Sequence, residues 1–548
     1  MRAGRPGLGK PELRAATASA TSVLAFVVVW LAMTVPDQSS RLVPSAFVQI
    51  PLEGLLLVVL VLVLPPRARR ITATAAGVVL GLLTIIKIFD MGFFEVLDRP
   101  YDLVIDWRYL GSAVGVVDDS SGRTAAIGVV VAAGLLGLGI LVLMPWAALR
   151  LSRTVTRHRT GSWRVVTACG AVWVLCAGLG VHVAHGVPVA SAGAAGYAYG
   201  QVSRIPSEIR DQRAFTRAAA SDPLRNVPAE EMLTGLRGKD VMFVFVESYG
   251  RVAVQGSTFS PGVGSVLDSG TRALRSAGFL TRSAFLTSPT FGAVSWLAHS
   301  TLQSGLWVDS QQRYDALVTS RRLTLSGVFK RAGWRTVGDV PANTHDWPQG
   351  AFYHYDQLYD SRNVGYAGPR FGYPTMPDQY TLDAFQRLEL GRKHRKPVMA
   401  EIDLVSSHAP WSRTPRMIDQ RRVRDGSVFD GMPEQAASKT EVWRSPQRVR
   451  DAYAESIVYS LNALVSFVQT YGGDDLVMVF LGDHQPATIV SGENSGHDVP
   501  VTVVAKDPHV LDQISGWGWQ DGMWPRPDAP VWRMDAFRDR FLAAFGSH

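Results

Sequence analysis

Val241-Met-Phe-Val-Phe-Val-Glu-Ser-Tyr-Gly250 is the stretch of this 548-residue chain that decides the fold. Six apolar residues, rich in Val and Phe, run into an acid and then a Tyr-Gly turn. A short apolar run bounded by turn residues is typical of a fully buried strand in a parallel sheet. Because ligands of open α/β sheets bind beyond the carboxyl ends of the strands, Glu247 is placed where a catalytic or metal-binding carboxylate would lie. On this stretch alone, an acid that only caps a helix fits equally well.

The same kind of pattern continues through residues 239–548. We expect buried strands at residues 241–246, 398–405, 476–481 and 499–505, and helices at residues 266–277, 323–332, 379–390 and 448–471. Strands that alternate with helices predict an α/β domain whose mostly parallel sheet is sandwiched by helices.

Acids and histidines follow three of the expected strands, at the same edge of the sheet. Glu247 follows the first strand, Ser406-Ser407-His408 follows the second, and Gly482-Asp483-His484 follows the third. A carboxylate oxygen combined with an imidazole nitrogen suits a divalent cation such as Zn²⁺ or Mn²⁺. An Asp-His pair alone is also common in loop salt bridges, but the convergence of three strand ends favours a metal site.

The first third of the chain is predicted to be a membrane anchor. Five apolar stretches lie at residues 16–35, 43–64, 71–94, 124–149 and 165–187. Each is long enough to cross a hydrocarbon core of ~30 Å, which needs about 20 helical residues. Lys and Arg gather in the N-terminal tail and in two of the short loops, which predicts that these face the cytoplasm. An odd number of spans then leaves everything after residue 187 outside the cell membrane.

These boundaries divide the chain into a cytoplasmic tail (1–15), a five-helix transmembrane domain (16–187), a linker (188–238) and an extracytoplasmic catalytic domain (239–548). Much of the basic excess behind the net charge of +8 lies in short loops between apolar segments, which indicates membrane orientation and not nucleic-acid binding. The two cysteines, Cys169 and Cys176, share one apolar stretch. The sequence therefore offers neither a disulfide framework nor a Cys-based zinc site.

Thr287-Ser-Pro-Thr290-Phe-Gly292 supplies a candidate nucleophile, because it precedes a helical pattern at residues 293–302. A hydroxyl just before a helix is usually an N-cap, which is the simpler interpretation. The N-terminus of that helix would also attract an anion, and a nearby metal would activate the hydroxyl. A phosphate held between the metal and the helix amides would then be open to attack by Thr290.

The order of these residues, with Glu at a strand end, Thr at a helix start and then Gly-Asp-His, resembles the alkaline phosphatase and sulfatase superfamily. With its anchor, the chain looks like the membrane-bound branch that contains lipoteichoic acid synthase and the lipid A phosphoethanolamine transferases. The resemblance implies an alkaline-phosphatase-like fold and a divalent metal, Mn²⁺ or Zn²⁺. The implied metal ligands are Glu247, Thr290, Asp483 and His484. His408 and His497 match histidines that contact the transferred phosphoryl group or a second metal.

The resemblance also implies a reaction. Thr290 would attack the phosphorus of a membrane phospholipid such as phosphatidylglycerol, and His408 or His497 would assist as proton donor or electrostatic clamp. The headgroup, of phosphoglycerol or phosphoethanolamine type, would then pass to a hydroxyl of a cell-envelope glycan or glycolipid. Trp347 resembles a substrate-binding Trp of phosphoglycerol transferases, but no Arg stands beside it in the sequence.

Other functions stay open. A membrane-anchored phosphodiesterase or phosphatase would use water in place of the acceptor, and the sequence does not separate it from a transferase. A sulfuric-ester hydrolase is disfavoured, because the chain lacks a Cys/Ser-x-Pro-Ser-Arg motif. A catalytically inactive membrane assembly protein is disfavoured by the presence of Glu247, Thr290, Asp483 and His484 together.

Overall fold

The computed structural model describes residues 10–546 except residues 110, 112–113, 116, 119–121 and 185. The chain forms two compact units. The first comprises residues up to 94 together with residues 99–209, and the second comprises residues 95–98 and those from 210 onward. Most of the predicted cytoplasmic tail and part of the loop between the third and fourth predicted spans lie outside the described residues.

The first unit is built from apolar helices. They are α1 (Lys10–Thr34), α2 (Leu52–Val63), α3 (Pro66–Leu97), α5 (Arg123–Arg157), α6 (Arg159–Leu179) and the first part of α7 (Gly193–Ala220). Small residues let these helices approach closely, since a Cβ atom on Gly77 of α3 would come within 2.5 Å of the Cα atom of Pro145 in α5. Many large apolar side chains of α5 point outward, Leu135 being 65% exposed, which suits a lipid environment.

Four helices among the described residues are long and apolar enough to cross a membrane: Ala16–Thr34, Pro66–Leu97, Arg123–Arg157 and Arg159–Leu179. They correspond to the first, third, fourth and fifth predicted spans. The second predicted span differs, because its α-helix α2 has 12 residues and is only about 18 Å long at 1.5 Å per residue. Pro44 and Pro51 precede it and cannot donate hydrogen bonds to a continuous helix, so the chain there forms a 3₁₀ turn and a short strand. The expectation of five full-length spans is not met at this position.

The second unit contains, within the described residues, a nine-stranded sheet of order β12-β6-β11-β10-β5-β9-β7-β8, with β13 beside β6. The strands are β5 (Asp240–Val246), β6 (Leu280–Thr287), β7 (Arg335–Val340), β8 (Gln357–Asp360), β9 (Val398–Leu404), β10 (Leu476–Gly482), β11 (Asp498–Ala505), β12 (Gln520–Asp521) and β13 (Val531–Arg533). Strands β10, β5, β9, β7 and β8 are parallel, whereas β11 is antiparallel to β10 and β6. The prediction of a mostly parallel sheet is confirmed.

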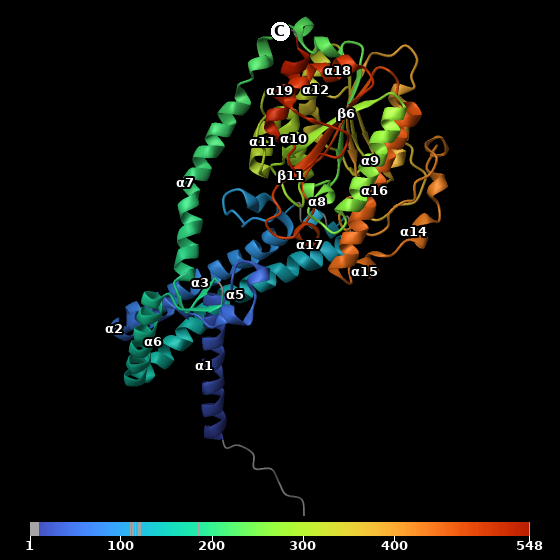
Figure 1. Ribbon diagram of the computed structural model, residues 1–548. Helices are drawn as coiled ribbons and strands as arrows, with labels where there is room; N and C mark the ends of the chain where they lie inside the picture. The colour runs from blue at the N-terminus through green and yellow to red at the C-terminus, as the bar shows by residue number, and fades with distance from the viewer. Residues whose placement is uncertain are drawn as a thin grey trace, which may run out of the picture. The chain divides into compact units, whose positions relative to one another are not determined.

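Helices cover both faces of this sheet (Figure 1). One face carries α9 (Ser260–Ser276), α13 (Asp378–Phe385) and α16 (Pro446–Tyr471), and the other carries α10 (Ser295–Ser304), α12 (Leu325–Arg331), α18 (Pro508–Gln513) and α19 (Asp535–Phe545). All four predicted helices are present, and α13 continues into a π-helical turn at Gln386–Leu390.

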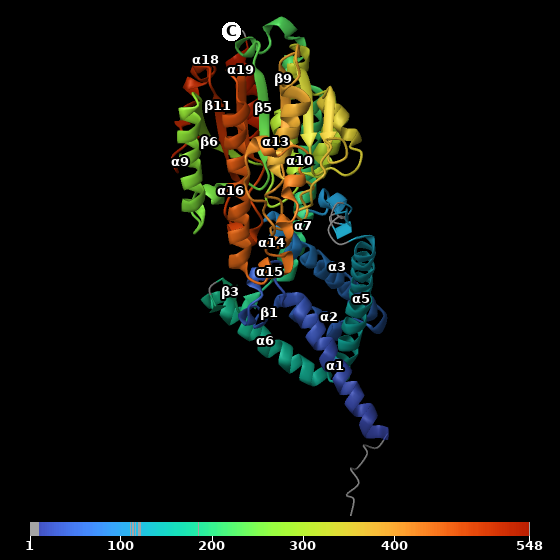
Figure 2. The same cartoon turned by 90° about the vertical axis from the view of Figure 1, so that its right-hand side faces the viewer.

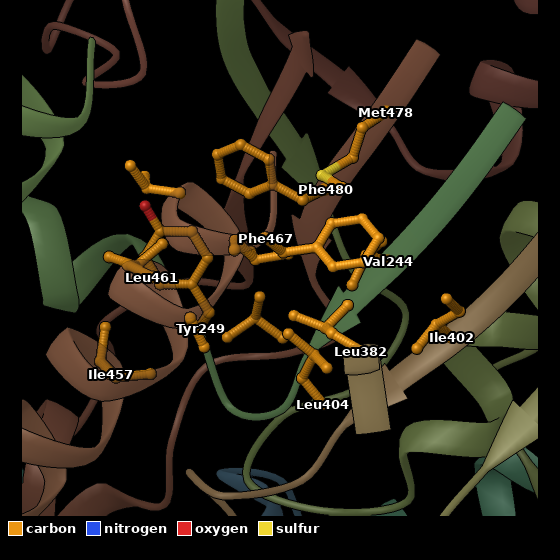
Figure 3. Packing of buried hydrophobic residues seen from close by; sticks show 14 of the residues in the cluster. Val244, Tyr249, Leu382, Ile402, Leu404, Ile457, Leu461, Phe467, Met478 and Phe480 are labelled. Atoms are coloured by element: carbon orange, nitrogen blue, oxygen red, sulfur yellow. The ribbon is translucent and has the colours of Figure 1, made fainter. Parts of the chain in front are cut away.

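The central strand β5 is buried on both sides, which explains its unbroken apolar sequence. Met242, Val244 and Val246 belong to the core under α16, whereas Phe243 and Phe245 belong to the opposite core. Helix α16 runs alongside the strands (Figure 2). Figure 3 shows side chains of α16 packed against those of β5, β9 and β10 in the first of these cores.

The strand directions bring several chain segments to one edge of the sheet. Strands β5, β9 and β10 are parallel, so the segments that follow them start at the same edge of the sheet. These segments carry Glu247, His408 and Asp483. Strand β6 ends there with Thr287, which is paired with Asp498 at the start of the antiparallel strand β11. His497, one residue before β11, therefore lies at this edge as well.

Replacing Glu389 with alanine should lower the free energy of unfolding by about 3 kcal/mol, because it breaks a buried ion pair. Glu389 is buried at the π-helical turn and accepts hydrogen bonds from Nε and Nη2 of Arg335, at 2.6 and 2.8 Å. It also accepts one from the hydroxyl of Tyr359 at 2.7 Å. Chemical denaturation of the purified variant measures the loss, and Glu434→Ala, at an exposed acid, is the control.

The same pair should make stability depend on pH. Burial alone would raise the pKa of Glu389, but the hydrogen bonds from Arg335 and Tyr359 lower it overall. The stabilisation should therefore be present above the ordinary pKa of glutamate and be lost as the pH falls through the lowered value. An equal loss of stability in Glu389→Ala and Glu434→Ala would contradict a stabilising ion pair between Glu389 and Arg335.

Candidate metal centre and active site

Glu247, Asp483 and His484 meet at the carboxyl edge of the sheet, and we call them the first cluster. Glu247 follows β5, and the other two residues follow the neighbouring strand β10. The Nε2 atom of His484 lies 3.4 Å from Oε1 of Glu247 and 3.7 Å from Oδ2 of Asp483. Ligand atoms of all three residues lie within 4.8 Å of one another, and all three residues are buried. Three of the four residues predicted as metal ligands are thus brought together.

Backbone groups hold this cluster in place. The backbone amides of Ser248 and His484 both donate to Oδ1 of Asp483 at 2.7 Å. Nδ1 of His484 lies 2.7 Å from the carbonyl oxygen of Gln485, and because a carbonyl only accepts, Nδ1 carries the proton. Nε2 of His484 is therefore free to act as a ligand, which is the usual arrangement of a metal-binding histidine.

Two carboxylates and one imidazole share this buried space. Burial and the charge of Glu247 raise the pKa of Asp483 to about 7. Burial opposes ionisation of Glu247 too, but the positive charges of His408 and His484 lower its pKa overall. Burial lowers the pKa of His484, but Asp483 and Glu247 outweigh it and raise that pKa to about 9. The cluster therefore stabilises positive charge at its centre.

These residues fit a divalent cation. Oδ2 of Asp483 is buried and has no hydrogen-bond partner among the described residues. A buried acceptor without a partner costs free energy, and a bound cation would remove that cost. Two carboxylates and one imidazole nitrogen are a donor set that both Zn²⁺ and Mn²⁺ accept.

Two glycines allow the loops that carry the first cluster to touch. A Cβ atom on Gly482 would lie 1.9 Å from the carbonyl oxygen of Tyr249, and one on Gly250 would lie 2.7 Å from the Cα atom of Gln485. At Gly250 the Oε1 atom of Gln485 would be nearer still, at 1.9 Å, but the clash with the backbone remains even if that side chain moves away. Glycine at these positions therefore lets Glu247 reach Asp483 and His484.

We expect Gly482→Ala to destabilise the domain by about 3 kcal/mol, at the upper end of the cost of overpacking. The matched control is Gly473→Ala, because a Cβ atom there meets nothing within 4 Å. Thermal unfolding of the two purified variants measures the difference. Equal unfolding temperatures would show that the contact between the two loops is not as tight as described.

The hydroxyl of Ser295 contacts the side chains of two residues of the first cluster. Its Oγ atom donates to Oε2 of Glu247 at 2.9 Å and lies 3.2 Å from Nε2 of His484. Ser295 is the first residue of the ten-residue helix α10, where backbone N–H groups without helical partners can bind an anion. The residue before it, Val294, has a φ of 63°, which is rare for a β-branched residue and is the kind of strain found at functional sites.

Thr290, the predicted nucleophile, lies in the loop between β6 and α10. Its backbone amide donates to Oγ of Ser288 at 3.2 Å, and its hydroxyl oxygen is 3.5 Å from the same atom. Ser288 in turn donates to the carbonyl oxygen of Asp483 at 2.6 Å. Across the described residues, no hydrogen bond joins Thr290 to a residue of the first cluster, so its connection runs through Ser288.

The two predicted histidines lie at the same edge. The ring of His408 stacks on Tyr373 with centroids 3.9 Å apart, and its charge acts on Glu247. The ring of His497 is tilted against Phe291 at 5.6 Å, and burial lowers the pKa of His497. Both therefore lie at the edge of the sheet that carries the first cluster, and their roles stay predictions.

Trp347 is held by aromatic neighbours. Its Nε1 atom donates to the hydroxyl of Tyr314 at 3.3 Å, and its ring centroid is 5.3 Å from that of Tyr353. An arginine distant in sequence approaches this segment, because Arg362 donates to Asp346 at 2.8 Å. The sequence alone gives no indication of that pairing.

Four serines of the site were missed from the sequence: Ser248, Ser288, Ser295 and Ser407. Ser407 donates from Oγ to the backbone carbonyl of Glu247 at 2.6 Å. Each of the four lies within three residues of a strand end or at the start of a helix. That position is the signal that could have identified them.

Comparison with known proteins gives one family match and several similar solved structures. The sulfatase family model matches residues 241–503, and no curated protein matches the chain. Among solved structures, the chain is similar to the lipoteichoic acid synthase LtaP from Listeria monocytogenes (14% identity, TM-score 0.34, 54% of this chain and 71% of that one). It is also similar to the C-terminal periplasmic domain of EcEptC from Escherichia coli in complex with Zn (11% identity, TM-score 0.38, 56% of this chain and 82% of that one). A third similar structure is that of the phosphoglycerol transferase GacH from Streptococcus pyogenes in complex with sn-glycerol-1-phosphate (12% identity, TM-score 0.34, 62% of this chain and 91% of that one). Residues 241–503, most of the second unit, are thus similar to the sulfatase family.

Proposed function

We propose that this protein is a metal-dependent transferase. It moves the headgroup of a membrane phospholipid, of phosphoglycerol or phosphoethanolamine type, to a hydroxyl of a cell-envelope glycan or glycolipid. The observation that carries the proposal is the contact of Ser295 with both Glu247 and His484, at 2.9 and 3.2 Å. A hydroxyl at a helix N-terminus, beside a cation-binding cluster, is the arrangement that covalent phosphoryl transfer needs.

The first cluster would hold the cation, Mn²⁺ or Zn²⁺, through Glu247, Asp483 and His484. When bound, the cation would neutralise phosphoryl charge and lower the pKa of a neighbouring hydroxyl. A hydrogen bond to Glu247 orients the hydroxyl of Ser295 at the start of α10, and Ser295 is the nucleophile of this proposal. Thr290, which the family resemblance favours, is the other candidate.

The first step joins Oγ of Ser295 to the phosphorus and breaks the bond from phosphorus to the diacylglycerol oxygen. The proton of Ser295 leaves along its hydrogen bond to Glu247 and passes on to solvent, because the lowered pKa of Glu247 does not let that carboxylate keep it. His408, whose charge acts on this site, supplies the proton that the leaving diacylglycerol oxygen takes. The N–H groups of the first turn of α10 bind the phosphoryl oxygens.

The second step frees Ser295, and proton exchange of His408 and His497 with solvent then restores the starting state. An acceptor hydroxyl attacks the phosphorus, the bond from Oγ of Ser295 to phosphorus breaks, and Ser295 regains a proton. His497 is suited to take the proton of the acceptor, because burial lowers its pKa and keeps it neutral. Each histidine thus serves one direction of proton transfer.

Helices of membrane-spanning length and composition support an anchored enzyme. An anchor keeps the enzyme in the same two-dimensional phase as its lipid donor. The predicted extracytoplasmic side is the side on which envelope glycans are modified. These considerations support a phospholipid donor and an envelope acceptor.

The experiment that tests this function separates transfer from hydrolysis. Purified full-length protein is incubated with headgroup-labelled phosphatidylglycerol or phosphatidylethanolamine, with and without an envelope glycan fraction. We expect labelled glycan, and little release of free headgroup phosphate without the acceptor. Equal release in both conditions would show that water is the natural acceptor and that the protein is a phosphodiesterase.

A further inference from the structure

A second group of ligand-type side chains lies next to the first cluster. Nδ1 of His299 is 3.5 Å from Oε1 of Glu401 and 3.4 Å from Oδ1 of Asp403. His299 lies one turn after Ser295 on α10, and Glu401 and Asp403 alternate along β9, so that both face α10. Ligand atoms of His299, Glu401 and Asp403, the second cluster, lie within 4.8 Å of one another.

The distances in the second cluster match those of a coordination site. Donor atoms around a four-coordinate cation with bonds of about 2.1 Å lie roughly 3.4 Å apart. The two distances from His299 are 3.5 and 3.4 Å, and those from His484 in the first cluster are 3.4 and 3.7 Å. The two clusters therefore present their ligand atoms at nearly the same spacing.

Surrounding residues hold the second cluster in place. The ring of His299 stacks on Phe245 with centroids 3.8 Å apart and planes at 15°. The other oxygen of Glu401 accepts a hydrogen bond from Nε2 of Gln303. Oδ1 of Asp403, the atom that faces His299, is buried and has no hydrogen-bond partner within the described part of the chain. Oδ2 of Asp483 in the first cluster is likewise buried without a hydrogen-bond partner among the described residues.

Negative charge exceeds positive charge in this interior. Burial raises the pKa of Asp403 to about 7, and the charges of Glu401 and of the first cluster add to this rise, against the effect of His299. Asp339, which is 1% exposed, has neither side-chain oxygen hydrogen-bonded among the described residues. Burial and the charge of Asp403 raise its pKa to about 8. If a cation were bound only at the first cluster, His299 would be the one positive partner named here for the acids of the second cluster.

We propose that His299, Glu401 and Asp403 bind a second divalent cation, of the Zn²⁺ or Mn²⁺ class. One imidazole and two carboxylates are a suitable donor set for such an ion. The second cluster contains neither His408 nor His497, the residues to which the family resemblance assigns a second-metal role. It is therefore a different site from the one the sequence predicts.

This cation would connect α10 to β9. His299 and Ser295 are four residues apart on the same helix, so a bond from His299 to a cation on β9 restrains the helix turn that begins with Ser295. The second cation thus acts as a positioning element for the reacting hydroxyl. Its presence does not depend on which headgroup is transferred.

Counting bound metal in matched variants tests the proposal. Untagged full-length protein in detergent is stripped with a chelator, loaded with Zn²⁺ or Mn²⁺, desalted and measured by inductively coupled plasma mass spectrometry. We expect two equivalents per chain in the natural protein and one in Asp403→Asn. We also expect one in Glu247→Gln, and none in the double variant. Asp474→Asn is the control, because Asp474 is a surface residue with an 83% exposed side chain.

A second measurement guards against a variant that folds poorly. In Glu247→Gln protein, added Zn²⁺ should raise the unfolding temperature, and the combination with His299→Gln should remove that shift. One equivalent in the natural protein, unchanged in Asp403→Asn, would overturn the second site while leaving the proposed function standing. Loss of one equivalent in Asp403→Asn but none in Glu247→Gln would instead support the second site and contradict the first.

Discussion

Replacing Ser295 with alanine should abolish headgroup transfer, with a loss of rate on the order of 10⁴-fold or more. The reason is that Oγ of Ser295 touches both Glu247 and His484, and that Ser295 begins the helix whose amides would bind the phosphoryl oxygens. Without it, the first bond to phosphorus cannot form. The rate of label transfer from phospholipid to glycan measures the effect.

The same assay on Thr290→Ala distinguishes the two hydroxyls. Thr290 is linked to the site through Ser288, so its loss should disturb positioning and cost on the order of a hundredfold or less. Ser269→Ala, at an exposed position on α9, should be as active as the natural protein. If Thr290→Ala were inactive and Ser295→Ala retained activity, the nucleophile would be Thr290. If both variants supported full function in cells, the protein would be an inactive assembly factor.

Removing the metal should lower the rate of headgroup transfer on the order of 10³-fold or more. A bound cation contributes several kcal/mol by stabilising the charge of the transition state. We expect a chelator to inactivate the natural protein and added Mn²⁺ or Zn²⁺ to restore it. Asp483→Asn should not be restored. Its remaining oxygen would still accept from the amides of Ser248 and His484, so the loop should keep its shape while the ligand oxygen is lost.

Asp474→Asn is again the matched control, and it should lose activity with chelator and regain it with metal. Circular dichroism of Asp483→Asn should match that of the natural protein. Full activity of the natural protein after exhaustive chelation, with no metal detected, would contradict a metal-dependent mechanism. Restoration of Asp483→Asn to the natural rate would remove Asp483 from the ligand set.

The parts of the fold that were predictable are those with unbroken apolar runs. Strands β5 and β10 are buried on both faces, and their sequences are almost entirely Val, Leu, Phe and Met. Strands β9 and β11 were also predicted, because the apolar residues of each outnumber the polar ones. Strand β6 was missed because Arg282 and Ser283 interrupt its pattern, although it pairs with β11 along its whole length. Strand β7 was missed because it carries the buried Asp339. Neither pairing partner can be read from the local sequence.

The site residues that could be predicted are those that directly follow a predicted strand. Glu247, Asp483 and His484 follow well-marked strands, so their approach could be inferred from sheet direction. The start of α10 could not, because the loop from Ser288 to Val294 is irregular and its geometry decides which hydroxyl begins the helix. The left-handed conformation of Val294 has no sequence signal, and it is what places Ser295 at the helix start. The second cluster was missed since His299 lies in mid-helix.

The most direct test of the central claim is fragmentation mass spectrometry of the protein after a brief incubation with phospholipid and no acceptor. Fragmentation of the peptide that contains both Thr290 and Ser295 locates any added mass. We expect a phosphoglycerol or phosphoethanolamine adduct on Ser295, dependent on metal and absent from Ser295→Ala. An adduct on Thr290 would move the nucleophile. Turnover of lipid without an adduct on either residue would contradict covalent transfer altogether.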